Sequence, residues 1–431
     1  MKIVSLIAGA GDMYCGSCLR DNALAGELKR CGHDLTLVPL YTPVRTDGAN
    51  FSEHKVYFGG ISIYLEQMSG MFRHLPKFLD KLWDLPSVIK AFAGRGVEID
   101  PQQLGALTVS ILKGEHGHQK KEIDHLVHWL RHAPKPDVVT IPYTLLIGLA
   151  HPLREATGRP VICSLQGEEF FLEGLREPFK SEALRLIRDQ VRGVDAFIAV
   201  SQYERDFMSE YLRIPRDKIF VVKLGVDTTG AALREPGIAN DPVFGFLGRI
   251  APEKGLHLLA DAFLQLRGRA AMGDATVEAA GYLAPERKPY LEDQRKKFRM
   301  AGVDYEFTYA GAPDWDGKMK FLQEVDILVM PSTFDEPKGL PALEALANGV
   351  PVIAPRRGAF PEMIEATGGG VLFVPDSVDS LAEAMLARLR NWDETMEMGR
   401  RGHGRVHAEW TLQHMAAHTE SVFEEVAARV R

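Results

Sequence analysis

The segment that follows the apolar run 327–330 carries the residues with the clearest chemical potential. It places two carboxylates, Glu336 and Glu344, on either side of Gly339 and Leu340. A helix that begins at this point would offer free backbone N–H groups and the positive end of its dipole to a phosphate. The carboxylates could accept hydrogen bonds from hydroxyls on both sides of that phosphate. A nucleoside diphosphate sugar has this chemistry; the alternative is an ordinary helix start with surface acids.

A second segment supplies positive charge. Gly248, Arg249 and Lys254 come directly after the apolar run 243–247. Two cations five residues apart after a glycine turn can both face a diphosphate and pair with its oxygens. On their own they would be interpreted as solvated residues, but they share one half of the chain with the two carboxylates. No Asp-rich metal site is evident, so we expect no metal and no cofactor, with the cations doing the work of a divalent ion.

The pattern of apolar runs predicts the elements that position these residues. Short β-rich runs alternate with amphipathic helical stretches, which is typical of parallel strands covered on both faces. We therefore expect an α/β protein with two Rossmann-like, doubly wound domains that face each other across a cleft. Ligands in such sheets bind at the carboxyl ends of the strands. Strands are expected at 2–6, 34–39, 137–141, 161–165, 196–200, 243–247, 276–281, 306–310, 327–330, 352–354 and 371–374.

Residues 233–242 mark the boundary between the two domains. They contain two prolines, a glycine and mixed charge, which is the composition of a linker. We expect a first domain over 1–232 and a second over 243–408. A C-terminal helical segment is expected over 409–431.

Composition narrows the classes of function. The 431 residues are 45% hydrophobic and 25% charged with a net charge of −7, which is typical of a folded soluble protein and argues against a nucleic-acid partner. No apolar stretch approaches the length of a membrane-spanning helix. Four cysteines are too few for disulfides to stabilise a chain of this size. We expect a cytoplasmic protein. Peripheral membrane contact stays open, because the apolar and basic segment 71–83 could lie on a membrane, shape an acceptor pocket or pack as an ordinary helix.

The order of the motifs resembles that of the retaining GT-B glycosyltransferases of family 4. The resemblance covers nearly the whole chain and is loose across 45–130. It implies transfer of a sugar, with retention and without a metal, from a nucleoside diphosphate sugar (UDP by default) to a hydroxyl acceptor. It also implies that the first domain binds the acceptor, that the second binds the donor, and that the helix in 409–431 crosses back to the first. The runs that carry it are 32–37, 136–139, 200–201, 225–227, 248–255, 331–332, 336–345 and 349–352.

The same resemblance assigns roles to single residues. Arg249 and Lys254 would grip the donor diphosphate, Glu336 would contact sugar hydroxyls and Glu344 the ribose. Lys338, at a position where many members have an aromatic residue, would add a cation beside the phosphate. The donor-binding set is Gly248, Arg249, Lys254, Glu336, Lys338, Gly339, Leu340 and Glu344, and the catalytic set is Arg249, Lys254, Glu336 and Gln166.

Gln166 is a departure from the family pattern. It stands after the run 161–165, where the family usually has a histidine near the anomeric carbon. Glutamine can hydrogen-bond a hydroxyl but cannot accept a proton near neutral pH. The leaving diphosphate can itself take the acceptor's proton. Two alternatives follow: a sugar-nucleotide-binding protein with weak or no transferase activity, and a GT-B nucleotide-sugar epimerase that uses Glu168 or Glu169 as its acid–base residue.

The first loop contains three glycines. Gly9, Gly11 and Gly16 would let the backbone approach donor and acceptor closely. A nicotinamide site is disfavoured, because Tyr14 stands where the third glycine of that motif should fall.

Cysteines and histidines suggest a metal only weakly. Cys15 and Cys18 are either two ordinary thiols or a redox disulfide, and Cys31 follows an expected helix that separates it too far from Cys18 for one zinc ion. His125, His128 and His132 would share one helix face, which is either solvated or part of a metal site without identifiable partners.

Overall fold

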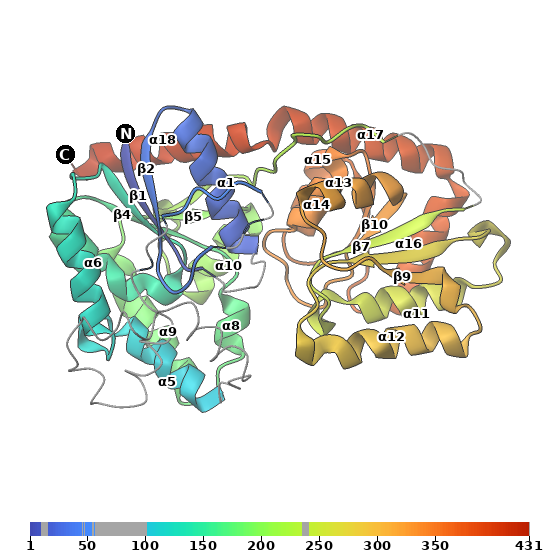
Figure 1. Ribbon diagram of the computed structural model, residues 1–431, viewed down its shortest axis with the longest axis horizontal. Coiled ribbons are helices and arrows are strands. Elements are labelled where there is room, and N and C mark those ends of the chain that lie inside the picture. The colour runs from blue at the N-terminus through green and yellow to red at the C-terminus, as the bar shows by residue number, and fades with distance from the viewer. Residues whose placement is uncertain are drawn as a thin grey trace. The chain divides into compact units, whose positions relative to one another are not determined.

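The computed structural model describes residues 1–9, 16–44, 46, 48–53, 56, 101–234 and 241–430. The chain divides into two compact units (Figure 1). The first comprises Met1–Val200, Glu204–Val222 and Ala416–Arg431, and the second comprises Ser201–Tyr203 and Lys223–Met415. The C-terminal residues therefore belong to the first unit, although they follow the second in sequence.

The first unit contains a six-stranded sheet with the order β2-β1-β3-β4-β5-β6, in which every neighbouring pair is parallel. Its central strands are short and buried on both faces, as their continuous apolar runs predict. The strands are β1 (Lys2–Ile7), β2 (Asp34–Pro39), β3 (Val138–Ile141), β4 (Val161–Ser164), β5 (Ala196–Ala199) and β6 (Ile219–Val221).

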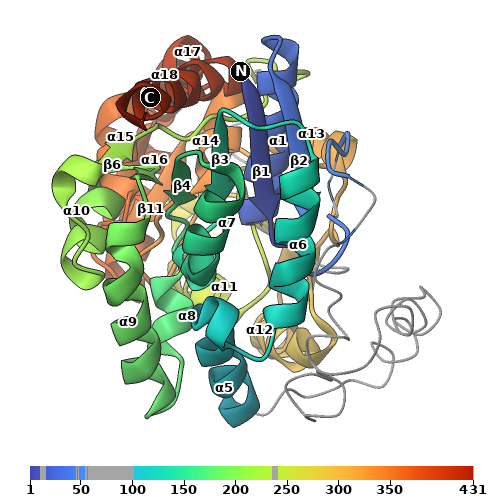
Figure 2. The ribbon, with the colours of Figure 1, turned by 90° about the vertical axis from the view of Figure 1, so that its left-hand side faces the viewer.

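Helices cover both faces of this sheet (Figure 2). One core packs the sheet against α5, α6, α7 and α9, and residues of α1 and α18 meet Ile3, Leu35 and Ile198 on the other face. The helices are α1 (Gly16–Arg30), α5 (Pro101–Leu112), α6 (Lys120–His132), α7 (Ala150–Thr157), α8 (Glu169–Glu173), α9 (Phe179–Gln190), α10 (Gln202–Tyr211) and α18 (Leu412–Val430).

The second unit repeats the architecture with the order β12-β11-β10-β7-β8-β9, again parallel throughout. Figure 1 shows α13, α14 and α15 on one face and α11, α12 and α16 on the other. The strands are β7 (Val243–Leu247), β8 (Thr276–Ala280), β9 (Phe307–Tyr309), β10 (Ile327–Val329), β11 (Val352–Pro355) and β12 (Gly370–Phe373). The helices are α11 (Leu256–Leu266), α12 (Lys288–Met300), α13 (Trp315–Glu324), α14 (Leu340–Ala347), α15 (Phe360–Thr367), α16 (Val378–Arg390) and α17 (Trp392–Glu409).

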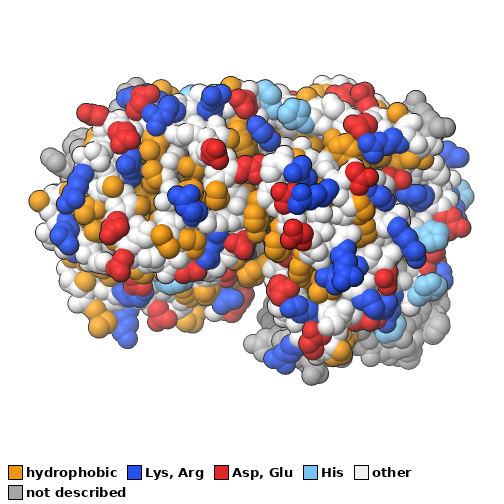
Figure 3. All heavy atoms as spheres, turned by 180° about the vertical axis from the view of Figure 1, so that it is seen from behind, with side chains coloured by type: hydrophobic (Ala, Val, Ile, Leu, Met, Phe, Trp, Pro, Cys, Tyr) orange, Lys and Arg blue, Asp and Glu red, His pale blue; other side chains and the backbone are white. Residues whose placement is uncertain are grey.

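The predicted α/β class with two doubly wound sheets is confirmed in both units. Every expected strand is present, and its ends shift by at most one residue. One strand was missed: β6 has three residues at a sheet edge, too few to show a periodic pattern. None of the helices that the structure describes is long and apolar enough to cross a membrane. Figure 3 shows acidic and basic side chains interspersed over one face of the molecule.

Candidate active site

Each sheet has one point at which the order of its strands reverses. In the second unit this point lies between β7 and β10, which are neighbours in the sheet although far apart in sequence. Ligands of doubly wound sheets bind outside the carboxyl ends of the strands at such a point. The loop after β7 carries Gly248, Arg249 and Lys254, and the loop after β10 carries Glu336 and Gly339. The fold therefore brings the two predicted segments to one place.

The two loops touch through their backbones. Thr333 N–H donates a hydrogen bond to Glu253 O at 3.0 Å. Gly255 has φ of 80°, and a Cβ at this position would lie 1.8 Å from Pro331 O. A side chain at residue 255 would therefore force the loops apart, so the glycine is required by a close approach of two backbones.

Lys254 and Glu336 form an ion pair across these loops. Their side chains are 17% and 9% exposed, and Lys254 Nζ lies 4.7 Å from the centre of the Phe334 ring. Burial opposes the charge on Glu336, but attraction to Lys254 and Lys338 and a hydrogen bond from Gly339 N–H outweigh it, so the pKa of Glu336 lies below its ordinary value. The carboxylate is therefore held ionised.

The helix α14 begins at Leu340, directly after this carboxylate. Gly339 precedes it in the left-handed conformation with φ of 63°, which favours glycine. Its N–H already bonds Glu336. The start of the helix thus combines its positive dipole end with a carboxylate and with partly buried Lys338.

Arg249 and Gly248 lie at the edge of this cluster. The Arg249 side chain is 51% exposed and pairs with Glu253 at 3.2 Å. The backbone O of Gly248 would lie 1.9 Å from a Cβ on Gly281, so the loops after β7 and β8 also approach closely. Both cations thus have an internal partner, and Arg249 is the more exposed of the two.

Glu344 has a partner that the sequence did not reveal. Lys318 of α13 donates to Glu344 Oε1 at 2.7 Å. Each carboxylate of the pair Glu336 and Glu344 is therefore matched by a lysine from another element. Lys318 precedes Glu344 by 26 residues, and no local pattern connects residues across such a distance.

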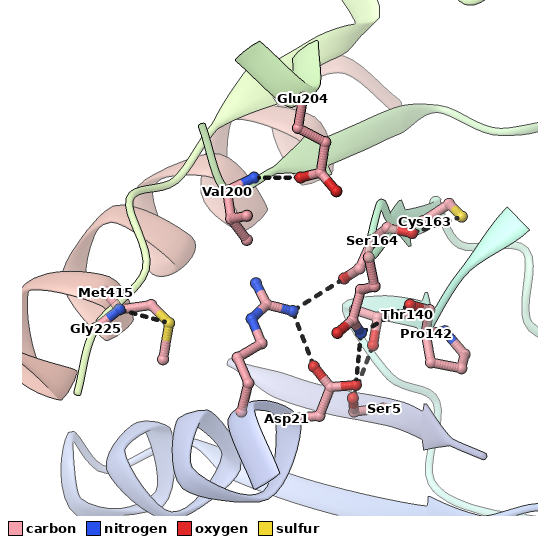
Figure 4. A network of polar contacts seen from close by, with 12 residues as sticks. Ser5, Asp21, Thr140, Pro142, Cys163, Ser164, Val200, Glu204, Gly225 and Met415 are labelled. Carbon is pink, nitrogen blue, oxygen red and sulfur yellow. Dashed lines mark hydrogen bonds and ion pairs between the residues drawn. The ribbon is translucent and has the colours of Figure 1, made fainter. Parts of the chain in front are cut away.

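In the first unit the order reverses between β1 and β3, and a buried polar network lies there (Figure 4). Gln166 Nε2 donates to Asp21 Oδ2 and to Pro142 O, both at 2.9 Å. Arg20 pairs with Asp21 at 2.8 Å, and these side chains are 1% and 10% exposed. Arg20 also donates to Ser164 Oγ at 3.4 Å. Sequence reasoning missed Arg20 and Asp21, because their position on α1 suggests nothing beyond an ordinary helix.

A small cavity of about 30 Å³ adjoins Arg20, Asp21 and Ser164. Such a volume holds about one water molecule and is far below that of a nucleotide pocket. This cavity is therefore no nucleotide pocket, and the bonds of Arg20 beside it hold α1 against the end of β4.

Glu168 belongs to the same framework. Its Oε1 accepts from Thr144 N–H at 2.9 Å and from Thr144 Oγ1 at 2.7 Å, and its Oε2 accepts from Gln166 N–H at 2.7 Å. Both carboxylate oxygens are bound within the protein, which favours a structural role over the acid–base role that an epimerase would require.

The remaining predicted features are only partly described. Gly9 has φ of 79°, and a Cβ there would lie 2.1 Å from Thr42 O; Gly16 begins α1. Gly11, Tyr14, Cys15 and the segment 71–83 lie outside the described residues. Within the part of the chain that the structure describes, no group of three or more His, Cys, Asp or Glu could hold a metal ion. The predicted histidine face includes His128 and His132, whose ring centres lie 4.3 Å apart with the rings tilted by 44°.

The fold is similar to that of solved glycosyltransferase structures. Anabaena HepE, solved in complex with UDP and glucose, matches with a TM-score of 0.69 at 16% identity over 98% of this chain and 99% of that one. Sucrose-phosphate synthase from Thermosynechococcus elongatus matches with a TM-score of 0.71 at 16% identity over 100% of both chains. The protein therefore has the GT-B fold.

Sequence comparison adds the family. The family model described as "Glycosyltransferase Family 4" matches residues 108–229, and the one described as "Glycosyl transferases group 1" matches residues 231–405. A GDP-mannose-dependent alpha-(1-6)-phosphatidylinositol monomannoside mannosyltransferase of Mycobacterium tuberculosis is 30% identical over 296 residues, which are 64% of this chain and 74% of the relative. The alpha-maltose-1-phosphate synthase of Mycolicibacterium smegmatis is 30% identical over 291 residues, 60% of this chain and 72% of the relative. The chain belongs to the glycosyl transferases group 1 family and is a glycosyltransferase of the GT-B type.

Proposed function

We propose that the protein transfers a sugar, with retention at the anomeric carbon and without a metal ion, from a nucleoside diphosphate sugar to a hydroxyl acceptor. The observation that carries this proposal is the cluster of Lys254, Glu336 and the start of α14 at the switch point of the second unit. The names of related proteins support the donor class: the mannosyltransferase is described as GDP-mannose-dependent, and HepE was solved with UDP-glucose. UDP stays our default nucleotide.

The cations of the second unit would stabilise the leaving diphosphate. Lys254 has three N–H donors, so it can keep its bond to Glu336 and still donate to a phosphate oxygen. Exposed Arg249 can add a bidentate contact, and the Leu340 amide with Lys338 can complete the anion site, whereas the Gly339 amide already bonds Glu336. Charge that develops on the diphosphate would meet donors already in position, which is how such sites accelerate a reaction.

The carboxylates would recognise hydroxyls. Ionised Glu336 is an acceptor for the hydroxyls of the transferred sugar, and Glu344 is an acceptor for those of the ribose. Since they lie on either side of Gly339 in the sequence, they would provide a hydrogen-bond acceptor for hydroxyls on each side of the proposed phosphate site.

The first unit would supply the acceptor side. Both amide hydrogens of Gln166 are engaged by Asp21 and Pro142, while its Oε1 has no hydrogen-bond partner among the described residues. We assign Oε1 to a hydroxyl of the reacting sugars, and Gly9, Gly11 and Gly16 to close approach of the backbone. Since Gln166 cannot take a proton, the leaving diphosphate would accept the proton of the acceptor hydroxyl.

The test uses the full-length protein with UDP-, GDP- and ADP-sugars and a panel of hydroxyl acceptors, including glycolipid acceptors in vesicles. We expect acceptor-dependent release of the nucleoside diphosphate, unchanged by EDTA, and a product with the donor's anomeric configuration by NMR. Binding without release would favour the binding-protein alternative, which rests on Gln166. Conversion of the sugar nucleotide without an acceptor would favour the epimerase.

A further inference from the structure

Lys318 is a nearly buried cation that the proposed reaction does not use. It lies near the start of α13, its side chain is 10% exposed, and it contacts a Glu344 side chain that is 15% exposed. Lys318 Nζ also lies 4.7 Å from the centre of the Trp315 ring. Burying an ammonium group is costly unless partners compensate for the lost water. A carboxylate and an aromatic face provide that compensation here.

Glu344 keeps one carboxylate oxygen for other use. Lys318 occupies Oε1 at 2.7 Å, whereas Oε2 makes no hydrogen bond within the described part of the chain. Glu344 is only partly buried, so a ligand hydroxyl can reach the carboxylate. The two carboxylate oxygens of Glu344 therefore differ: Oε1 is bound by Lys318, and Oε2 is open to a hydroxyl of a ligand.

Two contacts tie α13 to α14 and so determine where this carboxylate points. The first is the ion pair itself, and the second lies directly after the end of α14, where Gln323 Nε2 donates to Asn348 Oδ1 at 3.0 Å. Asn348 is 1% exposed, and its Nδ2 donates back to Glu344 O at 2.9 Å. Figure 1 shows α13 and α14 on the same face of the sheet. Backbone and side chain of Glu344 are thus both held through α13.

We propose that Lys318 is a positioning residue for the nucleoside side of the donor site: it holds Oε1 of Glu344 and directs Oε2 at one hydroxyl of the donor's ribose. This inference rests on the proposed function, in which Glu344 meets that ribose. A glutamate side chain that is fixed before binding loses less conformational entropy on binding, so the contact gains affinity. Lys318 would thereby set the preference for ribonucleotides over deoxyribonucleotides.

The test measures dissociation constants by calorimetry for the best-binding nucleoside diphosphate and for its 2′-deoxy and 3′-deoxy forms. Replacing Lys318→Met removes the charge and keeps the length of the side chain. We expect the ribonucleotide to bind about tenfold more weakly to this variant. The deoxy form that lacks the contacted hydroxyl should change by less than about twofold, because the interaction with Glu344 is already absent.

Three further variants make the result specific. Lys318→Arg keeps a cation beside Glu344 and should retain most of the ribose preference. Lys320→Met removes an exposed lysine of the same helix, 76% exposed and paired with Glu324 at 3.7 Å, and should change nothing. Adding Lys318→Met to Glu344→Ala should weaken binding no further than Glu344→Ala alone.

Two results would overturn the proposal. Equal weakening of the ribonucleotide and of both deoxy forms by Lys318→Met would mean that Lys318 only stabilises the fold, and unchanged binding would mean that it does not position Glu344. If the wild-type protein binds no nucleoside diphosphate, the proposed function itself fails and this inference fails with it.

Discussion

At the switch point of the second unit, two lysines act on one carboxylate: Lys254 and Lys338 both favour the charged form of Glu336. At that of the first unit, Arg20 pairs with Asp21, and the second carboxylate, Glu168, accepts hydrogen bonds from Thr144 and from the Gln166 N–H. A nearly buried network must satisfy each of its charges with an ion pair or with hydrogen bonds, because an uncompensated ion inside a protein is costly. A partly open cluster can carry extra positive charge. The comparison supports the proposal that the second unit binds an anionic ligand, whereas the charges of the first unit's network all have partners inside the protein.

The largest expected effect tests the framework. Asp21→Leu leaves the guanidinium of Arg20 buried without its carboxylate and should lower the free energy of unfolding by about 3–5 kcal/mol. The measurement is urea denaturation. Arg20→Met combined with Asp21→Leu removes both charges and should restore most of that loss. Equal stability of the single and double variants would show that the pair does not brace the unit.

The next effect tests the ligand cluster. Lys254→Met should lower the rate of sugar transfer about 100-fold, because it removes a donor aimed at the leaving diphosphate. Its unfolding free energy should fall less than that of Asp21→Leu, since Lys338 and Gly339 still support Glu336. The matched control is Lys297→Met, which breaks another ion pair of the second unit, with Asp261 at 2.6 Å. Wild-type turnover of the Lys254→Met variant would show that this cluster of the second unit does not act on the leaving diphosphate.

Two glycines of the second unit allow the effect of a steric clash to be distinguished from the effect of a positive φ. Gly255 and Gly268 have similar φ values, 80° and 82°. A Cβ at residue 255 would lie 1.8 Å from Pro331 O, whereas a Cβ at residue 268 would have no atom within 4 Å. Gly268→Ala should cost about 1 kcal/mol of unfolding free energy through strain alone. Gly255→Ala should cost clearly more and also weaken nucleotide binding, because the loops that carry Lys254 and Glu336 would separate. Equal costs by denaturation would contradict this account.

The smallest effect is a dependence on pH. The pKa of Glu336 is lower in the folded than in the unfolded state, so its contribution is complete above the unfolded value and is lost as pH falls through the folded one. Between neutral pH and about pH 3, wild type should therefore lose more unfolding free energy than Glu336→Gln. Denaturation at a series of pH values measures the difference, to which the other carboxyl groups contribute equally. Parallel curves for the two proteins would show that Glu336 is not specifically stabilised as an anion.

Much of the proposed donor site was predictable because its parts are local. The strand 243–247, the glycine turn after it and the helix start at Leu340 follow from apolar runs and turn residues within a few positions of one another. Even so, the bond between Lys254 and Glu336 spans 82 residues. The sequence predicts that both side chains contact a ligand, but it does not predict that they bond to each other.

The sequence by itself determined the class of fold, nearly every strand and the two segments that meet at the switch point, because the periods of apolar residues and the positions of glycine are short-range properties. Only the tertiary structure decided the partners. Gln166 and Asp21 bond across 145 residues, and Lys318 reaches Glu344 from a different helix. Such pairs depend on how strands are ordered in a sheet, and burial then decides which charges must be balanced inside the protein and which stay open to a ligand.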